Sequence, residues 1–297
     1  MGIIEKHNML TGFKVCEAMR KQVITLLETE SIKKAILKLI KYKTSAILLI
    51  DKDENPTGVV SKTDIMSAYY AQIPLDEELK TICVSTPIIC SEEDDLEKAL
   101  EIMRKNKIHR LYVYNNKNNI VGLLAYPDIV GLLYRLCSKC KSNYMLRSKQ
   151  KQYVNTISKF TVKEVMTTNV QSLKQSDSLY TVMEELSQYY FGAMLIRDNM
   201  DKPVGVVSKT DLILAYKHGV SADRPVKEIM TKGVKGCDHN SYLEKAIQLM
   251  IFSDIHRLFV YRKQPENIVG VLSFTDAARM KSGSCKACLS SRIQIDR

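Results

Sequence analysis

Serine and aspartate recur three residues apart at three places where a short apolar run ends. An ionised carboxylate only accepts hydrogen bonds, so an aspartate there can take both hydrogens of a vicinal diol. A helix beginning at the same turn offers unpaired N–H groups and positive potential to a phosphate. The simpler alternative is that each serine only caps its helix. The residues concerned are Ser61, Thr63 and Asp64, then Ser208, Thr210 and Asp211, then Ser273, Thr275 and Asp276.

Two histidine–arginine pairs come directly before apolar runs and are the second group of candidates. They are His109-Arg110 and His256-Arg257. A guanidinium can supply bidentate charge to a phosphate, and a permanent charge beside a core strand requires a partner. Each histidine could contact phosphate, or could equally be a half-buried side chain satisfied by backbone. We therefore expect the arginines to be the better ligand candidates.

Four of the eight cysteines form two CxxC pairs, Cys137 with Cys140 and Cys285 with Cys288. Each pair begins nine residues after an aspartate, Asp128 or Asp276, so the pairs occupy equivalent positions. Four thiolates form the ligand set of a structural zinc site, although the gap between the pairs is far longer than usual. An iron–sulfur cluster, a redox-active pair in each half, and an incidental duplication remain alternatives.

The chain repeats itself, and the repeat explains these equivalences. PTGVVSKTDIMSAY (56–69) returns as PVGVVSKTDLILAY (203–216), and IHRLYVY (108–114) returns as IHRLFVY (255–261), both after 147 residues. Each half is itself doubled, with shifts of 64 and 65 residues between its two aspartate motifs. The chain is therefore composed of four units of about 60 residues.

Every unit shows the same order of signals: an extended piece, a helix, an apolar run, a polar turn, a second strand, and a helix opening at the aspartate. Apolar residues at helical spacing identify the helices, and we expect Ser91 to cap the second of them and Ser176 or Asp177 the third. The short, uniformly apolar runs suit strands buried on both faces. The extended pieces are 23–27, 87–90, 170–173 and 234–237, and the apolar runs are 46–50, 111–114, 193–196 and 258–261.

The predicted fold class is α/β (α+β), with four β-α-β-β-α repeats forming two pseudo-symmetric domains. One unit buries too little surface to be stable alone, so we expect consecutive units to pair back to back. The predicted boundaries are 13–134 (repeats 13–70 and 80–134), a basic linker at 135–159, 160–280 (repeats 160–217 and 225–280), and a tail at 281–297.

These elements, with the Gly-h-h-Ser-x-x-Asp motif (h for apolar), resemble the cystathionine-β-synthase-type (CBS) domain in four copies. The resemblance implies clefts between paired repeats that bind AMP, ADP, ATP or S-adenosyl-methionine. It also implies that the motif aspartate holds the ribose hydroxyls and that the Ser or Thr contacts phosphate or ribose. The second unit departs from the pattern, because Ala125 stands in the serine position before Asp128. Asp128 remains a candidate, but we expect its site to be weaker or vacant.

The remaining composition favours a cytoplasmic protein, and the resemblance implies a regulatory protein that is not an enzyme. The chain has no long apolar run and no start of the kind that directs secretion. Its net charge of +11 is diffuse apart from the basic linker, so nucleic-acid binding is possible but not favoured. The resemblance further implies self-association into a homo-oligomer and an effector protein of unknown identity. A nucleic-acid-binding regulator or a metal- or redox-responsive scaffold is the alternative function.

Overall fold

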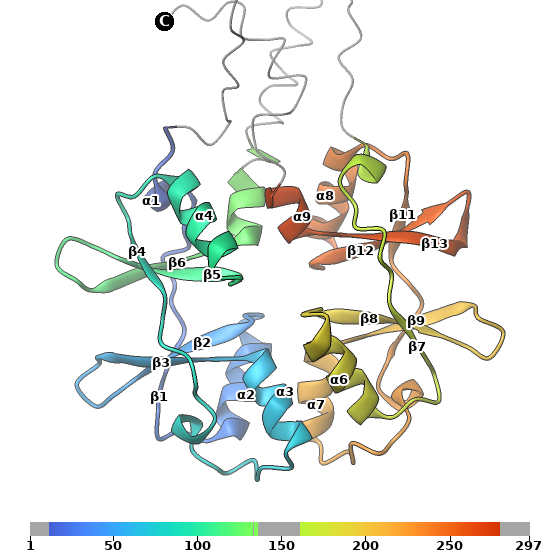
Figure 1. Ribbon diagram of the computed structural model, residues 1–297. Helices are drawn as coiled ribbons and strands as arrows, with labels where there is room; N and C mark the ends of the chain where they lie inside the picture. Colours follow the sequence, from blue (N-terminus) through green and yellow to red (C-terminus); the bar gives the residue numbers. More distant parts are fainter. Residues whose placement is uncertain (1–11, 133, 136–160, 280–297) are drawn as a thin grey trace, which may run out of the picture. The chain divides into compact units, whose positions relative to one another are not determined.

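The computed structural model describes residues 12–132, 134–135 and 161–279. These residues form a mixed α/β protein of four small repeats (Figure 1), as the sequence predicts. The first repeat consists of β1 (Thr25–Leu27), α2 (Ile32–Lys41), β2 (Ala46–Ile50), β3 (Pro56–Ser61) and α3 (Lys62–Tyr70). The second consists of β4 (Ile89–Ser91), α4 (Leu96–Lys105), β5 (Arg110–Tyr114), β6 (Ile120–Ala125) and a helix over 126–132.

The second half of the chain repeats this order. The third repeat consists of β7 (Ser172–Lys174), α6 (Leu179–Gln188), β8 (Ala193–Arg197), β9 (Pro203–Ser208) and α7 (Lys209–Lys217). The fourth consists of β11 (Gly236–Asp238), α8 (Leu243–Phe252), β12 (Arg257–Arg262), β13 (Gln264–Ser273) and α9 (Phe274–Arg279). Short helical segments precede the repeats: α1 (Val15–Ala18), η1 (Leu79–Thr81), η2 (Val162–Glu164) and η3 (Val226–Glu228).

Each repeat forms a small mixed sheet whose middle strand is the apolar run. In the first repeat, β1 pairs with β2 in parallel, and β2 pairs with β3 in antiparallel register, with Leu48 opposite Val59. The side chains of β2 are buried on both faces from Ala46 to Leu49, which confirms the prediction from its uniform apolarity. Its helices α2 and α3 lie on the same side of the sheet (Figure 1).

Two of the predicted helix caps are wrong. The N-cap of α4 is Asp95 rather than Ser91, and the N-cap of α6 is Ser178, whose side chain accepts from the N–H of Thr181, rather than Ser176 or Asp177. In both places a tight turn separates the strand from the helix. Within it, Asp94 accepts from the N–H of Ser91 at 2.9 Å, and an equivalent bond ends at Asp177. The polar residues stabilise that turn, so each helix begins later than predicted.

The segment that precedes each repeat packs on the neighbouring repeat in sequence, which the sequence did not indicate. Arg20, ahead of the first repeat, bridges to Leu123 in the second, while Ser85, ahead of the second repeat, bridges to Val59 in the first. The second half does the same: Thr167 bridges to Val271, and the short strand β10 (Thr231–Lys232) pairs with β9. Consecutive repeats therefore exchange their leading segments.

This exchange accounts for the glycine of the Gly-h-h-Ser motif. A Cβ on Gly122 would lie 2.6 Å from Met19 Sδ, and one on Gly205 would lie 2.6 Å from the backbone oxygen of Thr231. Both distances are below van der Waals contact. The leading segment thus lies so close to the second strand that this position has no room for a side chain.

The chain divides into two compact units, each of which takes one repeat from each half. One contains Val23–Ile88 and Val170–Val234, with the first and third repeats; the other contains Met1–Gln22, Ile89–Asn169 and Lys235–Arg297, with the second and fourth. In the former, α3 packs against α7 and the rings of Tyr69 and Tyr216 stack with centroids 4.9 Å apart. The pairing of consecutive repeats into two domains stays a prediction.

Candidate functional site

The Ser-x-x-Asp motifs sit where the second strand of a repeat passes into its last helix. At the start of α3, the N–H and the hydroxyl of Ser61 both donate to Asp64 Oδ2, each at 2.7 Å, and the N–H of Thr63 donates to Ser61 Oγ. Ser208 with Asp211 and Ser273 with Asp276 repeat the arrangement at 2.6–2.8 Å. The capping role is therefore real at all three motifs. All three helices begin two residues before the aspartate rather than at it.

Capping uses only one oxygen of each carboxylate. All the hydrogen bonds given above for Asp64, Asp211 and Asp276 end on Oδ2. Among the described residues, the Oδ1 atoms of these three aspartates have no hydrogen-bond partner, and the side chains are half-buried. An ionised carboxylate has about four lone-pair positions, so Oδ1 can accept from a ligand while Oδ2 holds the turn.

The first and third repeats bring two of these motifs together through reciprocal lysine–threonine hydrogen bonds. Lys62 Nζ donates to Thr210 Oγ1 at 2.7 Å, and Lys209 Nζ donates to Thr63 Oγ1 at 2.8 Å. The amino-terminal ends of α3 and α7 therefore lie beside each other, with two ammonium groups between them. Positive helix ends and lysines together favour an anion.

The second repeat differs in the way its sequence suggests. Asp128 Oδ2 accepts from the N–H of Ala125 at 2.8 Å, but Oδ1 is bound by Arg20 Nε at 2.9 Å. Burial raises the pKa of this carboxyl, and the nearby Arg20 guanidinium opposes that rise. Both oxygens of Asp128 are therefore engaged within the protein.

Arg110 and Arg257 begin the central strands β5 and β12. Desolvation lowers the pKa of both guanidinium groups, that of Arg257 to about 10, while the Asp276 carboxylate acts in the opposite direction. Tyr112 and Asp128 support the charge of Arg110 in the same way. With a pKa of about 10, Arg257 stays charged at neutral pH, so it places a poorly hydrated cation near Asp276.

The two histidines beside these arginines are exposed, not half-buried. The His109 ring meets Tyr126 edge-on at 5.8 Å between centroids, and the His256 ring is tilted against Phe274 at 5.6 Å. Tyr126 and Phe274 are the first residues of the helices that carry Asp128 and Asp276. Each histidine thus lies near a motif through its contact with the first residue of that helix. Thr275 is half-buried in the first turn of α9.

The four cysteines predicted to bind metal, Cys137, Cys140, Cys285 and Cys288, lie outside the described residues, as does most of the basic linker. Within the described residues, no group of three or more histidine, cysteine or acidic side chains is placed to hold a metal ion. The zinc prediction therefore stays a prediction. No helix in the described part of the chain combines the length and the apolar character needed to cross a bilayer.

Sequence reasoning missed three residues of the site: Lys62, Lys209 and Arg20. Each lysine stands inside the motif, between the serine and the threonine, so its place beside a helix start could have been noticed. Its partner could not, because it lies 148 or 146 residues away in the chain. Arg20 carried no signal, since the exchange of leading segments brings it to Asp128.

The chain is similar to known proteins in both sequence and structure. The family model described as "CBS domain" matches residues 15–71, 79–135, 162–218 and 226–283. Protein MJ1225 of Methanocaldococcus jannaschii is 23% identical over 215 residues, which cover 71% of this chain and 74% of that protein. Its crystal structure superimposes with a TM-score of 0.74, covering 90% of this chain and 99% of that one at 18% identity.

Two further proteins are similar to this chain, one in structure and one in sequence. An uncharacterised conserved protein from Pyrococcus horikoshii has a TM-score of 0.58 at 19% identity, over 90% of this chain and 99% of that one. The inosine-5'-monophosphate dehydrogenase of Methanocaldococcus jannaschii is 24% identical over 127 residues, which cover 42% of this chain but only 24% of the dehydrogenase. The shared part of that enzyme is therefore a minor fraction of its length.

Proposed function

Because the chain belongs to the CBS domain family, we propose that it is a regulatory protein that binds an adenosine-containing ligand and passes its state to a partner. AMP, ADP, ATP and S-adenosyl-methionine are the candidate ligands, and the Ser-x-x-Asp turns are the binding positions. One observation carries the proposal. Three motif aspartates each keep one carboxylate oxygen unused beside the start of a helix.

The free oxygen suits the ribose of such a ligand. A vicinal diol presents two hydroxyl donors, and an ionised carboxylate is the acceptor-only group that matches them. The other oxygen holds the aspartate in place through the serine, so its orientation is fixed before a ligand arrives. Fixed orientation lowers the entropic cost of binding.

The surrounding charge suits an anionic group on the same ligand. Lys62 and Lys209 lie at the starts of α3 and α7, and Arg257 on the adjoining strand interacts electrostatically with Asp276. A desolvated guanidinium binds phosphate bidentately. Ligand binding at Thr63 or Thr210 would compete with the lysine–threonine hydrogen bonds, which gives a route from occupancy to a change at the contact between the first and third repeats.

The proposal ranks the four motifs. Asp64, Asp211 and Asp276 are the ligand-binding aspartates, while Asp128 is a weak or vacant position because Arg20 occupies its second oxygen. His109, Arg110, His256 and Arg257 are phosphate ligands in this scheme. The protein acts without catalysing a reaction, and its effector, its self-association, its cytoplasmic location and zinc binding at the CxxC pairs belong to the same proposal.

The test is calorimetric titration of AMP, ADP, ATP and S-adenosyl-methionine into the full chain. We expect saturable binding of at least one of them, weakened about tenfold in Asp211→Asn, a loss that matches one charge-assisted hydrogen bond. Asparagine is preferred to alanine because its oxygen can still accept from Ser208 and preserve the helix cap.

Asp128→Asn is the matched control, since its second oxygen is already bound to Arg20. It should leave the affinity within about twofold of the unmodified protein, well under the 1.4 kcal/mol of a tenfold change. Absence of binding by all four compounds, or equal affinity in the Asp211→Asn protein, would remove the proposed site.

A further inference from the structure

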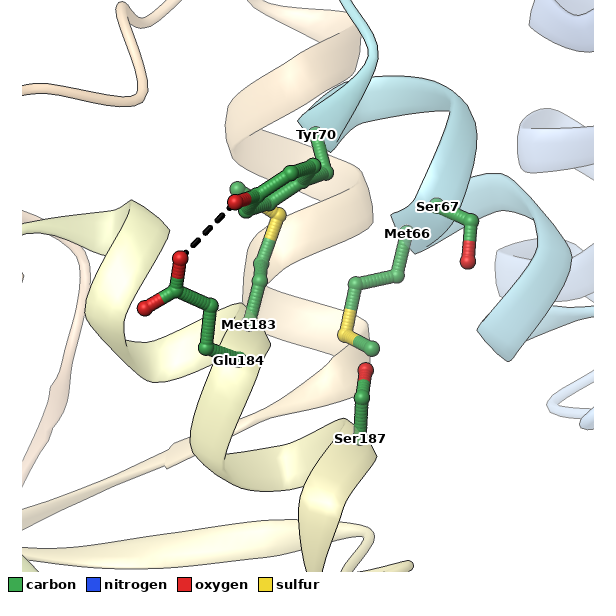
Figure 2. Close-up of a pocket in the computed structure, with 6 residues that line it drawn as sticks. All are labelled: Met66, Ser67, Tyr70, Met183, Glu184 and Ser187. Carbon is green, nitrogen blue, oxygen red and sulfur yellow. Dashed lines mark hydrogen bonds between the residues drawn. The ribbon is translucent and has the colours of Figure 1, made fainter.

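A pocket lies between α3 of the first repeat and α6 of the third repeat, within one compact unit (Figure 2). Its volume is about 220 Å³, below the range of about 300–1,000 Å³ that is usual for drug-sized ligands. Such a space suits a small organic molecule. The residues that line it are Met66, Ser67, Tyr70, Met183, Glu184 and Ser187.

The floor of the pocket is apolar and its walls accept hydrogen bonds. Met66 and Met183 are each 1% exposed, so their thioethers form a fixed apolar base. The Tyr70 hydroxyl donates to Glu184 Oε1 at 2.8 Å from the opposite helix (Figure 2). Within the described residues Glu184 has no other hydrogen-bond partner, and its Oε2 is open. That bond to the carboxylate raises the pKa of Tyr70, which keeps the phenol protonated.

Contacts with neighbouring side chains hold Tyr70 in place. Its ring packs edge-on against Tyr180 with centroids 5.2 Å apart, and Tyr180 in turn accepts a hydrogen bond from Gln72 Nε2. Tyr70 as a whole remains 44% exposed. An exposed tyrosine face attracts a cation.

The pseudo-symmetric position in the same unit has different chemistry. A shift of 147 residues replaces Ser67, Tyr70 and the carboxylate of Glu184 by Leu214, Lys217 and Leu37. Ser187 likewise corresponds to Ile40. The repeat architecture therefore does not require an acceptor-rich pocket, because the equivalent helices of the other half pack without one.

We propose that this pocket binds a small aliphatic amine. Its ammonium group would donate to Glu184 Oε2 and would lie near Tyr70. Its methylene chain would cover Met66 and Met183. An ammonium has only donors, which matches a pocket whose available groups are a carboxylate and hydroxyl oxygens. The site stands apart from the Ser-x-x-Asp turns and does not depend on nucleotide binding.

The experiment uses the full chain with ¹³C-methyl methionine and putrescine (1,4-diaminobutane) as the probe. The signals of Met66 and Met183 are assigned from Met66→Leu and Met183→Leu, volume-conserving changes that cores tolerate. Putrescine should shift both signals saturably, whereas 1,4-butanediol, which has the same length without charge, should not. Glu184→Gln should weaken the apparent affinity about tenfold.

Leu37→Gln places the same amide at the position equivalent to Glu184 and is the matched control, with unchanged affinity expected. Three outcomes would overturn the proposal. In the first, the methyl signals do not move at about 10 mM putrescine, a concentration at which even weak binding would be seen. In the second, 1,4-butanediol causes shifts equal to those of putrescine. In the third, the Glu184→Gln protein binds putrescine with unchanged affinity.

Discussion

The motif aspartates show that capping and ligand binding are compatible at one residue. A serine that caps a helix is usually regarded as structural, and the bonds from Ser61, Ser208 and Ser273 fit that reading. Since those bonds occupy a single carboxylate oxygen, the aspartate keeps half of its accepting capacity. Asp128 shows the other possibility, in which a side chain of the protein takes the second oxygen.

Arg20 gives the residue-scale prediction. Arg20→Met should cost about 1–2 kcal/mol of unfolding free energy at pH 7, because the Asp128 carboxylate, 10% exposed, loses its partner. Burial already raises the pKa of Asp128, and removing the guanidinium raises it further. The loss should therefore shrink as the pH falls and the carboxyl protonates.

Urea unfolding followed by circular dichroism between pH 4 and pH 7 measures this loss of unfolding free energy. The pH window is set by the ordinary aspartate pKa near 4 and by the raised pKa of Asp128 above it. Arg104→Met is the control, since its contact with Glu101 joins two exposed side chains and should contribute little. A loss for Arg20→Met that stays constant across the pH range would contradict the role assigned to the ion pair.

At the scale of elements, the order of strands and helices could be predicted because each carries a local signal. The central strands are uniformly apolar, and α2 has apolar residues at helical spacing that are buried at Ile32, Ala35, Ile36 and Leu39. The caps of α4 and α6 were missed because a polar residue stabilises a turn and a helix start by the same kind of bond. The exchanged leading segments could not be predicted, since no local pattern records which repeat a segment contacts.

The motif glycine tests that exchange. Gly205→Ala should destabilise the protein by about 1–3 kcal/mol, because its Cβ would meet the backbone oxygen of Thr231, which cannot rotate away. Gly131→Ala is the control, since nothing lies within 4 Å of its Cβ position in the helix over 126–132. That change should stabilise by up to about 1 kcal/mol through helix propensity.

The thermal unfolding temperatures of the two variants should therefore shift in opposite directions from that of the unmodified protein. A Gly205→Ala protein as stable as the unmodified one would mean that β10 does not lie against β9 as described.

At the scale of the molecule, the halves found in the sequence and the compact units of the structure divide the chain in different ways. The contact between the first and third repeats joins residues from opposite halves: Tyr69 OH donates to Val220 O at 2.7 Å, and Tyr216 OH donates to Ile73 O. The sequence predicted the duplication, but such a contact depends on surfaces that no repeat pattern encodes. For the candidate site, the sequence pointed to the aspartates, which belong to the repeated motif. It did not point to the lysines, because their partners lie in another repeat and no repeat pattern encodes that contact.

These two tyrosines give the prediction for that contact. Desolvation raises the pKa of Tyr69 and of Tyr216 to about 12. The unfolded chain ionises its tyrosines near pH 10, so the folded state should lose stability as the pH rises from about 10 to about 12. Tyr69→Phe with Tyr216→Phe should start about 1–3 kcal/mol less stable, from two lost hydrogen bonds, but should decline less steeply.

Thermal unfolding between pH 8 and pH 12, the window that brackets both the ordinary and the raised tyrosine pKa, provides the comparison. Tyr42→Phe, a change at an exposed ring, should leave the steepness unaltered. Parallel declines in the unmodified and doubly substituted proteins would show that the stacked pair is not the alkaline-sensitive element.

The exchanged leading segments also govern how the protein emerges from the ribosome. Residues around Arg20 are made early, but the strand that they join, at Leu123, follows about a hundred residues later. At 5–20 residues per second that interval is on the order of ten seconds. In the earlier part of that interval, until Ser85 has been made, the first repeat also lacks the segment that pairs with Val59. The edge of the first repeat is therefore open until the segment around Ser85 follows, and the segment around Arg20 lacks its partner until Leu123 has been made.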